Sequence, residues 1–177
     1  DRMAELLASN PVDDYLLHGG KSSVLARGTQ PRKVAAGGPP AEWSELQNGQ
    51  ETSTGWIIGL RHPLRPAERL AEFVLRDQAL STSGSGTQFF IRRGRRYGHI
   101  LDPRTGRPAE GLYSATVVAP TAAEADALST AFYVMGPAAV SEYCVKHPEI
   151  GALLVIPGPR DGDVRLLHFG LNDDQWR

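Results

Sequence analysis

The sequence predicts an α+β fold in which a mostly antiparallel sheet packs against helices. Segments of strand-like composition follow one another across short turns, at 15–20 and 22–28 around a glycine pair and at 151–157 and 164–170 around GPRDGD. Strands joined in this way form antiparallel hairpins. Segments with helical spacing are interleaved with such strand pairs, which favours α+β over a doubly wound parallel sheet. The length of 177 residues fits a single domain over 1–177.

The N-terminal part is predicted to contain a short helix and a long loop. Residues 2–9 place Met3, Leu6 and Leu7 on one side of a helix. Residues 29–54 hold three prolines and several glycines with little periodicity. This composition predicts a long loop insertion that buries little and that a protease cuts first.

Three elements are predicted between this loop and the middle of the chain. Residues 55–60, GWIIGL, have the composition of a strand, and residues 79–84 end another strand in a polar turn. Residues 66–78 are predicted to form a helix, because apolar residues recur there at helical spacing and Pro66 stands near its start.

The second half is predicted to contain a hairpin, a strand and two helices. Residues 87–101 form the hairpin, turning near Gly94, and residues 114–120 form the strand. A helix over 121–135 is indicated by the capping box of its first turn, T-x-x-E, in which the threonine caps the helix. A further helix is predicted over 138–147.

Composition excludes several functional classes. The net charge of −1 gives no global attraction to nucleic acid or to an acidic membrane. The four arginines around Gly94 lack the interleaved aromatics of a nucleic-acid surface, so we expect no nucleic-acid partner. Cys144 is the only cysteine, which excludes an internal disulfide. No apolar run has the length of a transmembrane helix.

The predicted helix at 121–135 carries a candidate cation site. Asp126 and Thr130 are four residues apart and therefore share one helical face. A carboxylate and a hydroxyl one turn apart can hold a hard cation such as Mg²⁺. Taken alone, the spacing favours a solvated helix face, because such pairs are common.

Three further motifs are also ambiguous when each is taken alone. The STSG turn at 81–84 and the Gly19-Gly20-Lys21 turn could hold a phosphate or could be ordinary turns. His99, in YGHILDPRTGRP, could accept a proton near neutral pH or could serve only in structure.

Together these motifs resemble one family, the FAD:protein FMN transferases or ApbE-type flavin transferases. The resemblance is carried by YGHILDPRTGRP (97–108), SATVVAPTAAEADALSTAF (114–132) and LSTSG (80–84). LLHGG (16–20) and GWIIGLRHP (55–63) match in order and spacing. The resemblance covers residue 1 to about 157 and implies an ApbE-like domain related to the T-fold.

The resemblance also implies a site for flavin and metal. His99 would lie beside the flavin diphosphate as a base or orienting group, and Asp126 and Thr130 would bind Mg²⁺. The residues implied to bind FAD belong to the glycine turn, the serine turn and the histidine loop: Gly19, Gly20, Thr82, Ser83, Gly84, His99, Ile100, Asp102, Pro103, Thr105 and Gly106.

The implied reaction is magnesium-dependent protein flavinylation by a bacterial enzyme. FMN passes from FAD to a threonine or serine hydroxyl of an acceptor flavoprotein, and AMP leaves. The partners implied are therefore FAD and the acceptor. Family members are often exported, so the resemblance implies the cell envelope or the periplasmic face, whereas the residues leave a cytoplasmic location open.

The sequence departs from the family pattern in ways that keep a second class open. The N-terminal segment of the family, ending in G-x-x-x-K-G-Y-x-x-D, is expected to be missing, with Asp1 as its last residue. A backbone carbonyl of that segment normally completes the metal site, so weak Mg²⁺ binding is expected. Lys21 and Ser85 replace residues that are usually Asn or Asp. The alternatives are a catalytically weak or inactive relative that binds FAD or a nucleotide, and a scaffold without ligand.

Overall fold

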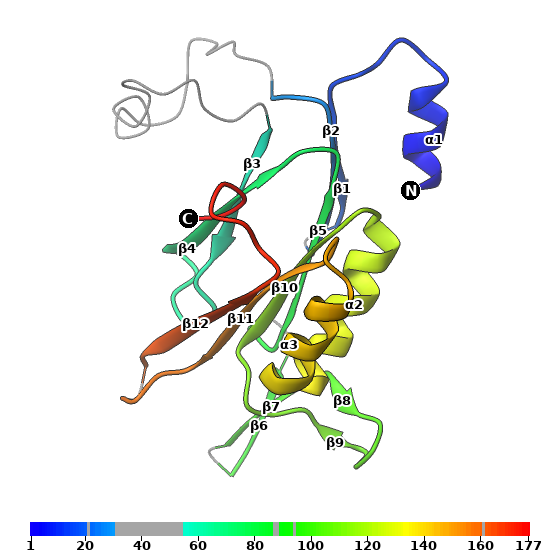
Figure 1. Cartoon of the computed structure of the whole chain (residues 1–177). Coiled ribbons are helices and arrows are strands. Elements are labelled where there is room, and N and C mark those ends of the chain that lie inside the picture. Colours follow the sequence, from blue (N-terminus) through cyan, green and yellow to red (C-terminus); the bar gives the residue numbers. More distant parts are fainter. Residues whose placement is uncertain (21, 31–54, 87–88, 94, 161) are drawn as a thin grey trace.

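The main sheet of the computed structural model has six strands in the order β1-β2-β5-β10-β11-β12, and every neighbouring pair is antiparallel (Figure 1). The structure describes residues 1–20, 22–30, 55–86, 89–93, 95–160 and 162–177. The strands are β1 Tyr15–Gly19, β2 Ser23–Arg27, β5 Ala79–Gly84, β10 Ser114–Ala119, β11 Gly151–Pro157 and β12 Val164–Phe169. The predicted α+β fold with a mostly antiparallel sheet is confirmed.

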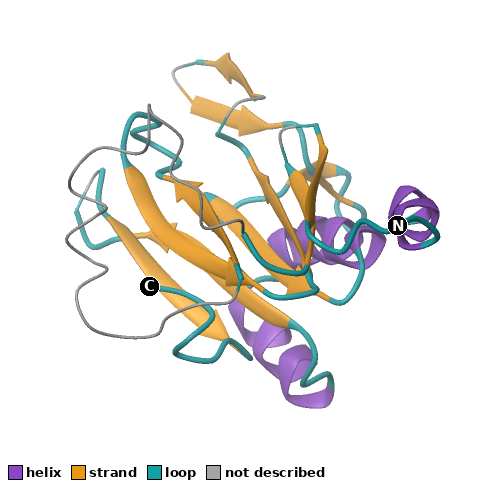
Figure 2. Cartoon of the chain, turned by 90° about the horizontal axis from the view of Figure 1, so that it is seen from above, coloured by secondary structure: helices purple, strands orange, loops and turns teal. Residues whose placement is uncertain are grey.

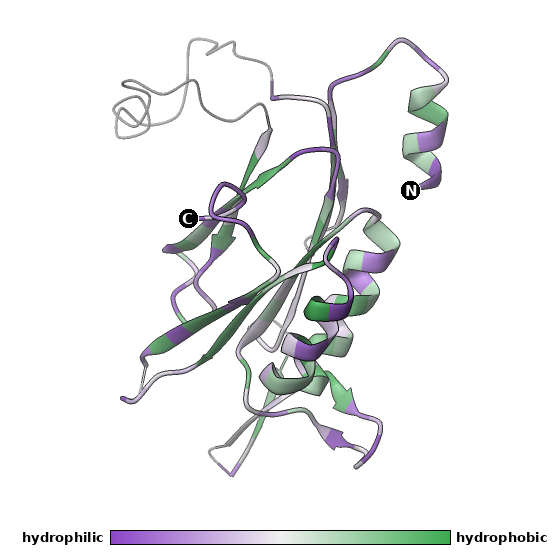
Figure 3. Cartoon of the chain, in the orientation of Figure 1, coloured by the Kyte–Doolittle hydropathy of each residue, from purple (hydrophilic) through white to green (hydrophobic). Residues whose placement is uncertain are grey.

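Two helices cover one face of this sheet (Figures 1 and 2). They are α2, Ala122–Met135, and α3, Pro137–Lys146. Alternate residues of β10, among them Ala115 and Val117, share a buried cluster with Phe132 of α2 and Val140 of α3. Hydrophobic and hydrophilic residues are interleaved along both helices, as expected when one side is buried (Figure 3).

The other face of the sheet packs against a hairpin formed by β3, Trp56–Arg61, and β4, Arg69–Leu75. Val118 and Leu153, on this face, are buried together with Phe73 of β4. The C-terminal segment extends the hairpin, because Trp176 forms a bridge with Phe73 and Val74 N–H donates to the carbonyl of Gln175. The sheet is therefore buried on both faces.

The helix predicted over 66–78 is wrong, because its central part is the strand β4. Ala71, Phe73 and Leu75 share the buried cluster against the sheet, and their spacing of two is the period of a strand; Val74, between them, is buried outside that cluster. The pairing with β3, which sets Trp56 opposite Leu75, satisfies the backbone polar groups of both strands. Packing against the sheet thus overrode a helical spacing that was present in the same residues.

The predicted start of α2 is confirmed. Glu124 N–H donates to Thr121 Oγ1 at 3.2 Å, so Thr121 is the N-cap. A second cap was not predicted: the Asp1 carboxylate accepts from the N–H groups of Ala122, at 2.8 Å, and Ala123, at 2.9 Å. A carboxylate at this end also interacts favourably with the helix dipole. The first turn of α2 is therefore fixed both locally and by the start of α1, Arg2–Ala8.

The remaining elements are short. The predicted hairpin near Gly94 consists of β6, Phe89–Arg92, and β7, Arg95–Gly98, with Gly94 itself outside the described residues. A small ladder joins β8, Leu101–Asp102, to β9, Arg107–Pro108. The predicted loop at 29–54 lies outside the described residues except for Thr29 and Gln30. No helix of the described part is both long and apolar enough to cross a membrane.

Candidate functional site

Five oxygen-bearing side chains gather between β5 and α2, and we call them the β5–α2 cluster: Ser81, Ser83, Asp126, Ser129 and Thr130. Ser81 Oγ donates to Asp126 Oδ1 at 2.9 Å. Ser83 Oγ lies 2.9 Å from Ser129 Oγ and 2.9 Å from Thr130 Oγ1. The alternation of side chains along β5 sends Ser81 and Ser83 to the same face of the sheet, the face that α2 covers.

The cluster has a buried base and an exposed rim. Ser81 and Ser129 are fully buried. Asp126 and Thr130 are exposed. The carboxylate and the threonine hydroxyl can therefore meet a ligand from solvent, while the serines beneath them lie within the protein.

The donor set of the cluster fits a magnesium ion. All five side chains offer oxygen, the ligand that Mg²⁺ prefers, and one of them is a carboxylate. Mg²⁺ is commonly bound through one or two carboxylates together with waters and substrate phosphates, rather than in an all-protein cage. No group of three or more His, Cys, Asp or Glu is gathered within the described residues.

The other residues predicted in the serine and glycine turns lie on or next to β5. Not all of them face the β5–α2 cluster. Thr82 Oγ1 lies 3.0 Å from Thr116 Oγ1 on the opposite face of the sheet. A side chain on Gly84 would meet the backbone of Tyr113, so glycine permits the close approach of β10 there. The turn that holds Gly19 and Gly20 is joined to β5, because Thr82 N–H donates to the carbonyl of Ser22 at 2.9 Å.

The loop after His99 is organised by Asp102. Its carbonyl accepts from the N–H groups of Thr105 and Gly106, and its carboxylate accepts from the N–H of Arg104 at 2.9 Å. Gly106 has φ +66, a conformation that favours glycine. Pro103 stands inside this turn, where a fixed φ is favourable. Asp102 and Gly106 therefore shape the loop.

The Arg104 side chain clamps the same carboxylate and ties the loop to α2. Its Nε and Nη2 donate to the two oxygens of Asp102, and Nη2 lies 3.3 Å from the carbonyl oxygen of Val134. The hydrogen bonds from the Arg104 side chain and then from its backbone N–H lower the pKa of Asp102. Val134 is one helical turn beyond Thr130, so the loop meets α2 next to the β5–α2 cluster.

We expect Arg104→Ala to raise the pKa of Asp102 toward the ordinary value of about 3.9. Because the folded-state pKa of Asp102 is lowered, the clamp is present above that ordinary value and is lost as the pH falls through the lowered one. A carbon-13 NMR titration of the side-chain carboxyl measures this midpoint. Arg107→Ala, a cation removed from the same loop, is the control. Equal titration midpoints of Asp102 in Arg104→Ala and Arg107→Ala would contradict the conclusion that Arg104 lowers the pKa of Asp102.

His99 and Ile100 connect the hairpin to this loop. Ile100 is buried in the helix-side core, and its carbonyl accepts from Ala109 N–H at 2.9 Å. His99 directly follows β7 and is exposed. The backbone at Ile100 is thus fixed on the core, while the imidazole beside it is accessible to solvent.

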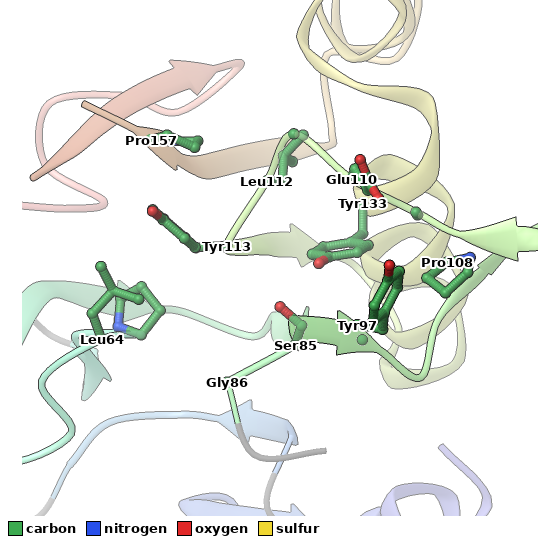
Figure 4. A pocket seen from close by; sticks show the side chains of 14 residues that line it. Leu64, Ser85, Gly86, Tyr97, Pro108, Glu110, Leu112, Tyr113, Tyr133 and Pro157 are labelled. Atoms are coloured by element: carbon green, nitrogen blue, oxygen red, sulfur yellow. The ribbon is translucent and has the colours of Figure 1, made fainter. Parts of the chain in front are cut away.

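A pocket of about 250 Å³ opens at the C-terminal end of α2, where Tyr133 forms part of its lining. Figure 4 shows Tyr97 and Tyr133 on one side of it, with Leu64 and Tyr113 across from them. Tyr133 follows Thr130 by three positions on α2. None of the residues predicted for the site lines this pocket, but Ser85 and Gly98 in its wall directly adjoin Gly84 and His99. The sequence motifs therefore mark its border.

The pocket wall at Pro63 and Leu64 is held by His62, a residue to which sequence reasoning assigned no role. The buried Nδ1 of His62 accepts from the N–H groups of Leu64, at 3.1 Å, and Arg65, at 3.2 Å. Burial lowers the pKa of His62, and the nearby Arg65 lowers it further. The neutral imidazole, which can accept these bonds, is thereby favoured.

Ser81 and Ser129 are the cluster members that sequence reasoning missed. Both lie inside motifs that carry predicted site residues, LSTSG and ADALST, in which the predictions were Thr82, Ser83 and Gly84, and Asp126 and Thr130. The period of two along β5 was an available signal, since it groups Ser81 with Ser83 and separates both from Thr82. No comparable spacing in the sequence pointed to Ser129 on α2.

Fold and site together define an α+β protein with an oxygen-rich site between a strand and a helix, beside an aromatic pocket. Sequence comparison gives the particular family. The chain belongs to the ApbE family, whose model matches residues 1–154.

Several relatives resemble the chain over most of its length or over its central part. The FAD:protein FMN transferase of Treponema pallidum is 30% identical over 162 residues, which cover 90% of this chain and 41% of the relative. The FAD:protein FMN transferase of Escherichia coli K12 is 39% identical over 89 residues, 49% of this chain and 25% of the relative.

Solved structures agree in fold. The ApbE protein of Thermotoga maritima superposes with a TM-score of 0.68 and 28% identity, over 93% of this chain and 46% of that one. The apo flavinyl transferase ApbE of Pseudomonas stutzeri gives a TM-score of 0.67 with 26% identity, over 96% and 45%. The chain spans less than half the length of each of these relatives.

Proposed function

We propose that this chain transfers FMN from FAD to a threonine or serine hydroxyl of an acceptor protein and releases AMP, with Mg²⁺ as the cofactor. The observation that carries the proposal is the β5–α2 cluster. Its exposed carboxylate and hydroxyl, Asp126 and Thr130, belong to the ADALST motif within the region that matches the family model. The names of the relatives in Treponema pallidum and Escherichia coli support the same substrate. We further propose that residues 1–177 act as one ApbE-like domain.

The proposed reaction is one displacement at phosphorus. The acceptor hydroxyl oxygen forms a bond to the FMN-side phosphorus, the bond from that phosphorus to the bridging oxygen breaks, and the electron pair leaves on AMP. The imidazole of His99, exposed at the end of β7, takes the hydroxyl proton. Asp126 and Thr130 would hold Mg²⁺, which supplies charge neutralisation at the diphosphate.

The residues proposed to contact FAD come from three segments of the chain. The first is the glycine turn at Gly19 and Gly20, and the second is the end of β5 at Ser83 and Gly84. The third is the histidine loop, with His99, Ile100, Asp102, Pro103, Thr105 and Gly106. Thr82 is left out, because its side chain faces the other side of the sheet. The aromatic pocket beyond Thr130 adds an apolar surface of the kind that planar ring systems occupy.

The test is a flavinylation assay with the purified chain. The chain is incubated with FAD, Mg²⁺ and a flavin-acceptor domain, and the denatured acceptor is examined for in-gel fluorescence while AMP is measured by chromatography. The flavinyl transferase of Pseudomonas stutzeri serves as the positive control, and an acceptor whose threonine is replaced by valine serves as the negative control. Labelled acceptor and AMP in equal amounts support the proposal.

The alternative function is FAD or nucleotide binding with little or no catalysis. Two sequence departures favour it, Lys21 and Ser85, of which Ser85 lies in the pocket wall and Lys21 lies outside the described residues. FAD that binds to the chain by fluorescence titration, with neither AMP nor labelled acceptor after prolonged incubation, would favour this alternative over transfer.

A further inference from the structure

We infer that Ser81, Ser83 and Ser129 are positioning residues that orient Asp126 and Thr130 toward a bound cation. This inference rests on the proposed function, since it concerns the same metal site. In that proposal Ser81 and Ser129 would touch neither metal nor FAD, and Ser83, which would contact FAD, would not touch the metal. Their effect would pass entirely through the hydrogen bonds of the β5–α2 cluster.

The hydroxyl of Thr130 sets the first requirement. A threonine hydroxyl has one proton and two lone pairs. If its oxygen faces a cation, the proton must be donated elsewhere, because a proton directed at the cation would be repelled. Ser83 Oγ, 2.9 Å from Thr130 Oγ1, is the nearer acceptor, whereas the carbonyl oxygen of Asp126 is 3.5 Å away.

The remaining hydroxyls can pass their protons on in one direction, away from Thr130. Ser83, having accepted from Thr130, can give its own proton to Ser129 Oγ at 2.9 Å. Ser129 in turn donates to the carbonyl oxygen of Asp126 at 2.9 Å. A carbonyl accepts and never donates, so this end determines the direction of the whole series. The series Thr130 to Ser83 to Ser129 to the Asp126 carbonyl therefore leaves the lone pairs of Thr130 free for a cation.

Ser81 performs the equivalent role for the carboxylate. Its hydroxyl donates to Asp126 Oδ1 at 2.9 Å, which fixes the rotation of the carboxylate about its last bond. The second oxygen of Asp126 can then be presented from the exposed side chain without a search among rotamers. Partners that orient a ligand in this way typically change metal affinity by about 10- to 100-fold when removed.

Burial makes the arrangement specific. Ser81 and Ser129 are fully buried, so their hydroxyls are kept from bulk water and depend on partners within the protein. No buried side-chain N or O atom of the described part lacks a hydrogen-bond partner. Removing one hydroxyl therefore leaves its neighbour without the matching donor or acceptor.

The experiment measures metal binding rather than activity. Mn²⁺, which also takes oxygen ligands, is titrated into the full chain, and free Mn²⁺ is followed by electron paramagnetic resonance. Ser129→Ala and Ser81→Ala are compared with the unaltered chain and with Asp126→Ala. The matched control is Thr116→Val, which removes a buried hydroxyl paired with Thr82 on the opposite face of the same sheet. Thermal unfolding of each variant establishes that it is folded at the titration temperature.

The inference predicts that Ser129→Ala and Ser81→Ala each weaken Mn²⁺ binding by about 10- to 100-fold, with no change for Thr116→Val. Unchanged binding in both serine variants, with binding lost in Asp126→Ala, would overturn the inference and leave the proposed metal site intact. Binding that is absent from the unaltered chain, or insensitive to Asp126→Ala, would overturn the metal site and the inference together. An equal loss in Thr116→Val would show a general effect of stability and would also overturn it.

Discussion

Asp126→Ala is expected to lower the rate of FMN transfer by about a hundredfold or more. Asp126 is the one carboxylate of the β5–α2 cluster, and its exposed oxygens would carry the charge that holds Mg²⁺ beside the diphosphate. Loss of charge stabilisation at a transferring phosphoryl group costs about 3 kcal/mol or more, which corresponds to roughly a hundredfold in rate. The measurement is the initial rate of in-gel flavin fluorescence on the acceptor domain at saturating Mg²⁺.

The control for this prediction is Glu124→Ala. Glu124 lies on the same helix two positions earlier, and the interaction that it contributes to the cap comes from its backbone N–H, which the variant retains. Its rate should stay close to that of the unaltered chain. A rate for Asp126→Ala within a few-fold of the control would remove Asp126 from the reaction and would favour the FAD-binding alternative.

Phe132→Ala is expected to lower the free energy of unfolding by about 3–5 kcal/mol, the range for deleting a buried aromatic ring. Phe132 is fully buried between α2 and the sheet, and its ring meets that of Tyr143 edge to face at 5.3 Å between centroids. Since domains are commonly stable by only about 5–15 kcal/mol, this change removes a large share of the total. Urea denaturation followed by circular dichroism measures it.

Val145→Ala on α3 provides the comparison, because Val145 is 82% exposed. Its free energy of unfolding should remain within about 0.5 kcal/mol of the unaltered value. The packing described for Phe132 would be contradicted if the two variants lost similar amounts. A midpoint that shifts with an unchanged denaturant slope would show a change in stability without a change in the surface exposed on unfolding.

Interactions between residues close in sequence were enough to predict several elements of the fold and part of the site. The start of α2 follows from the capping box of Thr121 and Glu124, whose atoms are close in sequence and therefore interact in any context. The same helix period placed Asp126 and Thr130 on one face. The hairpins β1–β2 and β11–β12 were predictable because short turns leave antiparallel pairing as the simplest arrangement.

The strand β4 shows where local chemistry was insufficient. Its apolar residues satisfy a helical spacing and a strand spacing at once, and isolated propensities differ too little to choose between them. The choice was made by β3, which supplies hydrogen bonds along one edge, and by the sheet, which buries Phe73. Both lie outside the segment itself, so the segment alone could not specify its own structure.

The sequence by itself determined the family, the capping of α2 and the pairing of a carboxylate with a hydroxyl one turn apart. Only the tertiary structure decided which hydroxyls surround that pair. Ser81 and Asp126 are 45 positions apart, and Asp1 caps a helix 121 positions away. Such contacts depend on the strand order of the sheet and on which face each residue of β5 presents. A shift of one residue in the register of β5 would send Thr82 toward α2 in place of Ser81 and Ser83, and no pattern within LSTSG distinguishes the two registers.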